Sequence, residues 1–194
     1  MPKLGMEPVR RAALVRATID EIGATGTLDI TVSKIAKRAG MSSALAHHYF
    51  GGKDQIFLAA MRHTLTVYGR EVRAGLAKAD GPKARLEAII RASFTSSNFR
   101  RDVIAAWLNF YVLAQSSPPA QRLLSIYQRR LHSNLVHDLR PLIGARAGPA
   151  AQRIAGLIDG LYLRQGLARD PDPSDGATRH VLAVLTAELK GNAQ

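Results

Sequence analysis

Side chains that can donate hydrogen bonds or touch methyl groups gather between residues 31 and 53. Hydroxyls, imidazoles and an ammonium group can donate to phosphate oxygens or base edges, and short apolar side chains can contact a thymine methyl group. This is the chemistry of DNA recognition. The candidate contacts are Thr31, Ser33, Ser42, Ser43, Ala44, Leu45, His47, His48, Tyr49 and Lys53, with Lys3, Arg10 and Arg11 as further candidates for phosphate contact or for an N-terminal arm.

Two short helices with a tight turn between them would position these side chains. Thr31 can cap a helix over residues 32–39, and Gly40 can take the left-handed conformation that ends it. Ser42 can then cap a second helix over residues 43–49. Helices joined in this way form a helix-turn-helix unit, whose second helix enters the major groove. Helical proteins that never meet DNA can contain the same spacing, so at this point both interpretations stay open.

Apolar residues recur at spacings of three and four along nearly the whole chain, which is the period of a helix. One stripe runs through Val15, Ile19 and Ile22, and a longer one begins at Leu58. Glycine and proline cluster between the stripes, one such break covering residues 141–149, and strand-like alternation is nowhere sustained. The sequence therefore predicts an all-α fold of about nine helices.

The formal net charge of +12 favours a polyanionic partner, because neutralised phosphates release counterions. Residues 1–55 hold eight Lys and Arg against five Asp and Glu, a net of +3, so charge alone does not locate the DNA site. No stretch combines a dense basic face with a broad apolar one, which argues against a membrane surface as partner. The charge pattern therefore favours nucleic acid only weakly.

The residue inventory also restricts location and catalysis. The chain has no cysteine, no run of 18 apolar residues and no apolar leader segment, so we expect no disulfides and a cytoplasmic location. Its six histidines include no i, i+4 pair that could hold a metal ion, and Gly51-Gly52-Lys53-Asp54 lacks the rest of a phosphate-binding loop. We therefore expect no enzyme, no cofactor and no metal site.

The segment around the two short helices resembles the tetracycline-repressor (TetR) family of bacterial regulators. The resemblance implies an all-helical, homodimeric transcriptional repressor with a DNA-binding domain over residues 1–52 and a regulatory and dimerisation domain over 53–194. It also implies that the last two helices, over 148–168 and 174–190, pair across the dimer axis. The matching residues are Thr31, Ile35-Ala36, Ala39-Gly40, Ser42, Tyr49-Phe50 and, at the start of a long linking helix, Lys53.

The resemblance extends along the chain to members of that family that respond to choline and control choline uptake and glycine betaine synthesis. Tyr111 and Tyr162 stand where tryptophan is expected in close relatives, and both substitutions keep an aromatic face. The resemblance thus implies choline, or a similar cation, as the inducer that releases the operator. The segments that carry it are MPKLGM at the N-terminus, HHYF at 47–50, AWLNFY at 106–111, RRLHSNLV at 129–136 and LIDGLYLR at 157–164.

The chemistry of choline suits the aromatic residues of the second domain. A quaternary ammonium group has no hydrogen to donate, and aromatic faces attract it through their quadrupole. Trp107, Phe110 and Tyr111 share one helical face, and Asp159, a carboxylate, lies three residues before Tyr162. The candidate ligand contacts are Trp107, Phe110, Tyr111, Tyr127, Asp159 and Tyr162.

Each of these residues also has a structural interpretation. Trp107 and Tyr127 can be core residues, since aromatics at helical spacing often are. Asp159 can pair with an arginine across a dimer interface instead of with a ligand. For the whole protein, the alternatives are a repressor of the same family that senses a different, lipophilic ligand, a small helical enzyme, and a nonspecific DNA binder with a steep salt dependence.

Overall fold

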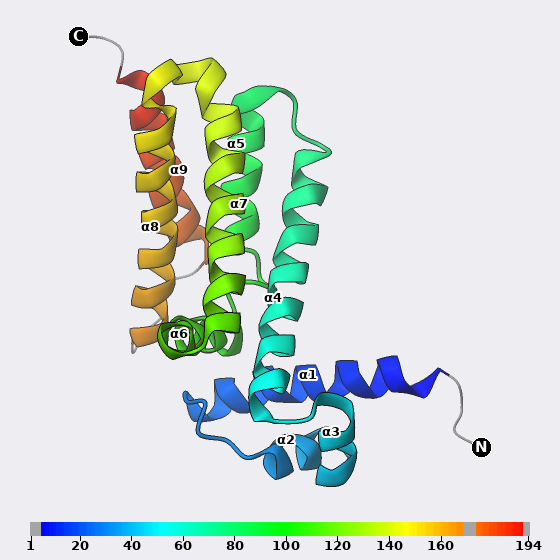
Figure 1. The fold of residues 1–194 in the computed structure, drawn as a ribbon. Coiled ribbons are helices and arrows are strands. Elements are labelled where there is room, and N and C mark those ends of the chain that lie inside the picture. Colours follow the sequence, from blue (N-terminus) through cyan, green and yellow to red (C-terminus); the bar gives the residue numbers. More distant parts are fainter. Residues whose placement is uncertain (1–4, 169–173, 192–194) are drawn as a thin grey trace. The chain divides into compact units, whose positions relative to one another are not determined.

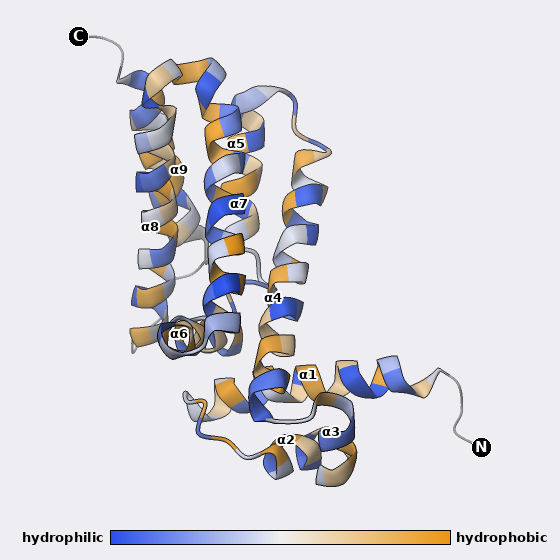
Figure 2. Ribbon diagram, in the orientation of Figure 1, coloured by the Kyte–Doolittle hydropathy of each residue, from blue (hydrophilic) through white to orange (hydrophobic). Residues whose placement is uncertain are grey.

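The computed structural model describes residues 5–168 and 174–191, and every regular element in these ranges is a helix (Figure 1). The predicted all-α fold is confirmed. Hydrophobic and hydrophilic residues alternate along the helices at the spacing of a turn, as expected for helices with one buried face (Figure 2). The helices are α1 (Met6–Thr25), α2 (Val32–Arg38), α3 (Ser43–Phe50), α4 (Lys53–Leu76), α5 (Gly81–Ser93), α6 (Arg101–Ser116), α7 (Pro118–Ile143), the 3-10 helix η1 (Gly144–Arg146), α8 (Ala147–Leu167) and α9 (Ser174–Lys190).

The helix bounds agree closely with the sequence prediction. The two short helices, the long helix from Lys53 and the last two helices each lie within one or two residues of their expected positions. The expected break over residues 141–149 is shorter than predicted, since α7 continues to Ile143 and Pro149 lies in the first turn of α8. Proline is tolerated in a first turn because its missing N–H has no partner there in any case.

The first compact unit comprises the described residues up to Thr64 together with Arg101–Gln121. Within it α1 packs against α2, α3 and α6. Gly23 allows the close approach of α1 to α6, since a Cβ at this position would lie 2.7 Å from the Cα of Asp102. Fully buried side chains from five helices form its core: Leu14, Ile22, Ile35, Ala46, Ile56, Ile104 and Phe110.

The second compact unit comprises Leu65–Arg100 and the described residues from Arg122 onward. Here α9 packs against both α5 and α8. The buried carboxylate of Asp138 accepts a hydrogen bond from Arg85 Nε at 2.8 Å, so its charge is paired. The apolar core contains Leu86, Ile89, Leu135, Leu139, Ile154, Ile158 and Val181.

The chain passes between the two units at residues 64–65, 100–101 and 121–122. The predicted boundary at residue 52 divides the chain by function, and it stays a prediction. Within the described ranges, none of the helices combines the length and the apolar character that crossing a membrane demands.

Candidate DNA-binding and ligand sites

The turn between α2 and α3 is held by side-chain caps and a left-handed glycine. Thr31 Oγ1 accepts a hydrogen bond from the Lys34 amide at 3.2 Å, and Ser42 Oγ accepts one from the Leu45 amide at 3.2 Å. Gly40 has φ of 69°, where a side chain would be strained. The local arrangement is therefore a helix-turn-helix, as the sequence predicted.

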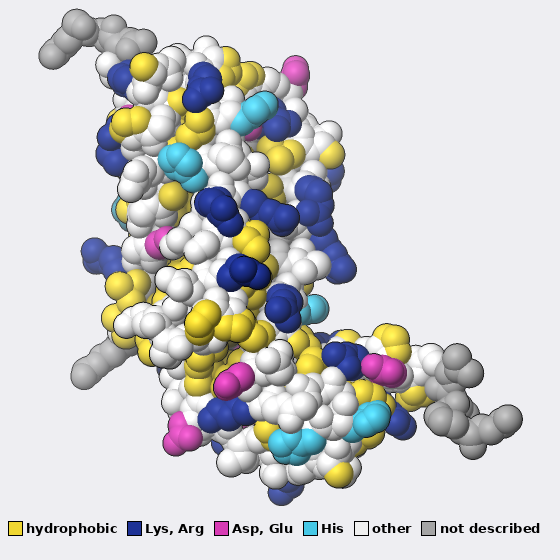
Figure 3. All heavy atoms as spheres, in the orientation of Figure 1, with side chains coloured by type: hydrophobic (Ala, Val, Ile, Leu, Met, Phe, Trp, Pro, Cys, Tyr) yellow, Lys and Arg dark blue, Asp and Glu magenta, His cyan; other side chains and the backbone are white. Residues whose placement is uncertain are grey.

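Helix α3 carries six of the ten side chains that were expected to meet DNA, and the others lie on α2, on α4 and at the caps of α2 and α3. Of the eight residues of α3, all of them described, Ala46 alone is buried. Histidine side chains are exposed on the face drawn in Figure 3. Exposed candidates are Thr31, Ser33, Ser42, Ala44, His47 and His48, and half-buried ones are Ser43, Leu45, Tyr49 and Lys53.

Several of these candidates also contact their own protein. Ser43 Oγ donates to Ser33 Oγ at 2.9 Å, which joins the two helices across the turn. His47 Nδ1 lies 3.1 Å from the carbonyl oxygen of the residue after α3. The ammonium of Lys53 lies 5.6 Å from the centre of the Phe57 ring. These contacts restrain the side chains before any DNA is bound.

A buried carboxylate that the sequence analysis missed fastens α2 to α1. Arg38 Nε donates to Glu21 Oε1 at 2.5 Å, and Lys34 Nζ lies 3.1 Å from Oε2 as an ion-pair partner. The hydrogen bond from Arg38 lowers the pKa of Glu21 below its usual value, against the opposing effect of burial. Its position, seven residues after Leu14 on the buried face of α1, is the signal that could have revealed it.

Arg10 and Arg11 reach the end of α3 from α1. Arg11 Nη1 donates to the Tyr49 carbonyl at 2.5 Å, and Arg10 Nη1 lies 3.4 Å from the Tyr49 hydroxyl. Lys3, the third basic candidate, lies outside the described residues. Both arginines, which were candidates for phosphate contact or for an N-terminal arm, thus contact α3.

Five aromatic rings and one carboxylate form a cluster in the second unit, here called the aromatic cluster. Its rings come from α4, from the α5–α6 connection, from α7 and from α8. The Tyr68 and Tyr127 ring centres are 5.8 Å apart in an edge-on arrangement, and three further rings contact one another at 5.2–5.8 Å. The members are Tyr68, Phe94, Phe99, Tyr127, Tyr162 and the carboxylate of Asp159.

Ser93 links the two parts of the aromatic cluster. Its carbonyl accepts a hydrogen bond from the Tyr162 hydroxyl, which also lies 3.3 Å from the Asn98 carbonyl. Burial raises the pKa of the Tyr68 phenol, and the negative charge of Asp159 raises it further, while a hydrogen bond with the Ser93 side chain acts in the opposite direction. The Asp159 carboxylate is therefore close enough to the Tyr68 hydroxyl to act on it electrostatically.

Glu71 holds the connection that supplies two of these rings. Its carboxylate accepts a hydrogen bond from Asn98 Nδ2 at 2.5 Å and others from the hydroxyls of Thr95 and Ser97. Asn98 also donates to the Ala92 carbonyl at 2.9 Å, so the segment between α5 and α6 is hydrogen-bonded both to α4 and to the end of α5. This network fixes the backbone that carries the two phenylalanine rings of the cluster.

The structure brings together three of the six predicted ligand residues. Tyr127, Asp159 and Tyr162 belong to the aromatic cluster, and Trp107, Phe110 and Tyr111 lie on α6 in the first unit. The Trp107 ring centre is 6.2 Å from that of Phe110 and 5.8 Å from that of Tyr111. Since Trp107 and Phe110 are buried, they contribute to the core of that unit, and their part in ligand binding stays a prediction. The sequence analysis missed Tyr68, Phe94 and Phe99.

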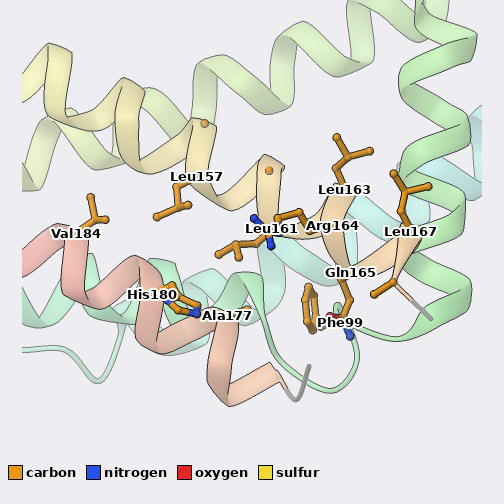
Figure 4. A pocket seen from close by; sticks show the side chains of 13 residues that line it. Phe99, Leu157, Leu161, Leu163, Arg164, Gln165, Leu167, Ala177, His180 and Val184 are labelled. Carbon is orange, nitrogen blue, oxygen red and sulfur yellow. The ribbon is translucent and has the colours of Figure 1, made fainter. Parts of the chain in front are cut away.

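An apolar groove of about 950 Å³ runs between α8 and α9 in the second unit. Leu157 and Leu161 of α8 face His180 and Val184 of α9 across it, and Phe99 lies at one end (Figure 4). Small residues of α8, Gly156 and Gly160, leave the floor of the groove open. Among the described residues, no three His, Asp or Glu side chains come close enough together to hold a metal ion.

Comparison with known proteins identifies the family. Residues 14–60 match the family "Bacterial regulatory proteins, tetR family", and residues 82–190 match "BetI-type transcriptional repressor, C-terminal". The HTH-type transcriptional regulator BetI of Brucella suis biovar 1 is 49% identical over 192 residues, which cover 98% of this chain and 97% of that protein. The chain belongs to the TetR family. Like those relatives, this TetR-family chain is a DNA-binding transcriptional regulator and not an enzyme.

Another BetI regulator and two solved structures of transcriptional regulators are also similar to this chain. The BetI regulator of Agrobacterium fabrum is 49% identical over 172 residues, 88% of this chain and 84% of that protein. A transcriptional regulator of Pseudomonas aeruginosa PAO1 shares 28% identity and superposes with a TM-score of 0.80 over 95% of this chain and 92% of its own. A regulator of Saccharomonospora viridis, solved in complex with choline, has a TM-score of 0.80 over 91% and 95% of the two chains at 21% identity, which establishes the shared fold.

Proposed function

We propose that α3 is the recognition helix of this repressor and enters the major groove of its operator. The observation that supports this role is the capped turn that presents the outer face of α3 with only one residue of the helix buried. Imidazole and hydroxyl groups on that face can donate to base edges and phosphates, and an exposed alanine can meet a thymine methyl group. The proposed DNA contacts are Thr31, Ser33, Ser42, Ser43, Ala44, Leu45, His47, His48, Tyr49 and Lys53.

Choline is the proposed inducer, and the aromatic cluster is its proposed site. The observation that carries this proposal is the aromatic cluster itself, in which five rings gather and Asp159 lies one turn before Tyr162 on α8 and acts electrostatically on the Tyr68 phenol. The ring faces attract a quaternary ammonium group by about 0.5–2 kcal/mol each. The quaternary ammonium group of choline has no N–H to donate, so it needs a negative charge nearby rather than a hydrogen-bond acceptor. The carboxylate of Asp159 can supply that charge. The choline complex of the Saccharomonospora viridis regulator, which has the same fold, supports the same ligand class.

A carboxylate at this site has a further electrostatic purpose. The chain carries a net charge of +12, so its field repels a cation in general. Asp159 reverses the sign of that field locally, in surroundings where water screens little because Tyr127 and Tyr162 are buried. Choline is then attracted to the cluster and repelled elsewhere.

The proposed assembly is a homodimer in which α8 and α9 of two copies cover each other's groove. The groove is lined by leucines and small residues, and Leu163 and Leu167 are 49% and 72% exposed on the same helix. A second copy would remove this apolar surface from water. Two recognition helices would then meet successive major grooves of a two-fold symmetric operator.

Regulation follows from a difference in choline affinity between two forms of this dimer. Choline shifts the population toward the form that it binds more tightly, and the proposal is that this form presents the recognition helices at a spacing unsuited to the operator. The helices α4 and α7 each run from one unit into the other, so they are the proposed carriers of the change. Release of the operator then permits expression of genes for choline uptake and glycine betaine synthesis.

The experiment that tests this function is fluorescence-polarisation binding to duplex DNA from upstream of the protein's own gene, without choline and with saturating choline, against a random duplex. We expect tight operator binding that choline weakens. The neutral isostere 3,3-dimethyl-1-butanol should have no effect, because it lacks the charge that Asp159 attracts. If choline does not change operator binding, the protein is still a DNA-binding repressor, but choline is not its inducer. A response to the neutral isostere would indicate a lipophilic ligand.

Two variants locate the inducer site. Asp159→Asn should weaken choline binding by about tenfold or more, since it removes the charge partner. Glu87→Gln, an equal change of charge on the surface of α5, is the matched control and should leave choline affinity unchanged. Trp107 is the single tryptophan of the chain, so its intrinsic fluorescence reports directly whether choline reaches α6. A choline-dependent change that Asp159→Asn does not affect would place the ligand at α6 instead.

A further inference from the structure

The recognition helix α3 buries only one of its side chains completely. Its single buried residue, Ala46, is small, and its other side chains face water or are half-buried. Such a helix depends on contacts at its ends. The beginning is held by the Ser42 cap and by the hydrogen bond between Ser43 and Ser33.

The end of α3 is held from α1 chiefly by Arg11, whereas Arg10 makes a longer contact of 3.4 Å with the Tyr49 hydroxyl. Arg11 Nη1 donates to the carbonyl of Tyr49, one of the last four carbonyls, which have no partner within the helix. The guanidinium carbon of Arg11 lies 4.4 Å from the centre of the Phe50 ring, so the cation also stacks on the last residue of the helix. A positive charge at this end is further favoured by the helix dipole.

Arg11 is itself restrained from the other side. Glu7, one turn earlier on α1, accepts from Arg11 Nη1 at 3.3 Å. The planar guanidinium can donate to a carbonyl, pair with a carboxylate and stack on a ring at the same time, which the point charge of a lysine cannot do. Glu7, Arg11 and the end of α3 thus form one connected group.

We propose that Arg11 is a positioning residue for DNA recognition: it sets the direction of α3 relative to α1 and so sharpens discrimination between the operator and other DNA, without contacting a phosphate itself. Discrimination requires that side chains of α3 reach particular base edges, whereas nonspecific binding requires only positive charge near phosphates. A loosened α3 therefore loses operator affinity while its affinity for random DNA stays the same. Loss of operator affinity alone therefore indicates a positioning role, whereas loss of a phosphate contact would lower the affinity for both kinds of DNA.

The test compares Arg11→Gln with Arg16→Gln, which removes the same charge from an exposed arginine of the same helix that is not a candidate contact. Affinities are measured over a range of salt concentrations for the duplex that the wild-type protein selects from a random-sequence pool and for a random duplex. We expect Arg11→Gln to lower the ratio of operator to random affinity by about tenfold or more, with the salt slope unchanged. Arg16→Gln should leave that ratio at the wild-type level.

Two other results would overturn the proposal. Equal losses on both duplexes, with a salt slope reduced by about one, would make Arg11 a phosphate ligand. An unchanged ratio would show that the contact has no role. If Arg11→Gln does not fold, as judged by thermal unfolding, Arg11→Lys decides: it keeps the charge, and we expect the ratio to fall partway, whereas a wild-type ratio would again reject positioning.

Discussion

At the scale of single residues, buried charge is the feature with the largest expected effect on stability. Glu21 lies on the buried face of α1, and its carboxylate is compensated by Arg38 and Lys34 of α2. Removing the charge while keeping the shape therefore leaves two cations without their partner. The contact also determines where α2 sits on α1, and with it the start of the turn that leads to α3.

Glu21→Gln should lower the free energy of unfolding at neutral pH by about 1–2 kcal/mol, since the partners of Glu21 are partly exposed and screened by water. The pKa of Glu21 is lowered in the folded protein, so its contribution is present above its unfolded pKa and is lost as the pH falls through the folded value. Urea unfolding at pH 7 and at pH 3 measures both effects, and the difference between variant and wild type should shrink at pH 3. Glu87→Gln, which breaks a surface pair at 3.9 Å, is the control. A pH-independent difference would contradict this account.

Candidate DNA contacts could be proposed from the sequence, but the aromatic cluster could not be assembled from it. The caps, the turn and the outward face of α3 depend on neighbours within four residues, which spacing reveals. Tyr68, Phe99 and Tyr162 lie on segments far apart in the chain, and only packing of the second unit brings them together. Arg11 was a candidate for phosphate contact or for an N-terminal arm, and its contact with Tyr49 could not be predicted because the two residues are 38 positions apart.

At the scale of elements, Ser42 combines two roles that substitution can separate. It caps α3, and its exposed position makes it a proposed phosphate contact. Ser42→Ala removes the cap and should lower the free energy of unfolding by about 1 kcal/mol. Ser42→Asp keeps a capping oxygen, so it should retain wild-type stability while its negative charge weakens DNA binding, most strongly at low salt. Thermal unfolding and DNA binding at two salt concentrations measure these effects, and tight DNA binding by Ser42→Asp would show that Ser42 does not approach a phosphate.

The contact of α1 with α6 provides a second prediction at this scale. Because a Cβ on Gly23 would come within 2.7 Å of Asp102, Gly23→Ala must push the two helices apart. We expect a loss of about 1–3 kcal/mol in the free energy of unfolding, the usual cost of overpacking. Gly148→Ala is the control, since nothing lies within 4 Å of a Cβ there and alanine should be neutral or slightly stabilising. Equal stability of the two variants would mean that the helices separate without cost.

The sequence was enough to predict the helices, but it did not predict that α6 packs against α1. Each helix is defined by apolar spacing and by glycine, proline or hydroxyl residues at its ends, all of which are local signals. The packing of α6 on α1 joins residues far apart in the chain, so local spacing does not reveal it. In the structure it depends on Gly23 and on the hydrogen bond from Asn109 Nδ2 to the Gly26 carbonyl at 3.1 Å. The compact units therefore follow packing, with residues 101–121 in the first of them, and the division into a DNA-binding and a regulatory domain stays a prediction.

At the scale of the whole molecule, charge and apolar surface have separate roles. Lysine and arginine side chains are spread over the surface, including the region of α7 (Figure 3), and raise the affinity for any DNA. The apolar groove between α8 and α9 is the surface that can join two copies. A dimer contacts both half-sites of a two-fold symmetric operator at once, whereas a monomer contacts one. Dimerisation should therefore raise the affinity for the operator relative to the affinity for other DNA.

Leu161→Glu tests this role of the groove. Leu161 lines the groove, and a carboxylate there would have to be buried without a partner when a second copy covers it. We expect the wild-type protein to sediment as a dimer and Leu161→Glu as a folded monomer, with operator affinity reduced by about hundredfold or more because each half-site is then bound separately. Leu142→Glu, at an exposed leucine of α7 that does not line the groove, is the control and should remain dimeric. A dimeric Leu161→Glu protein with wild-type operator affinity would place the dimer interface elsewhere, and a monomeric wild-type protein would reject the homodimer itself.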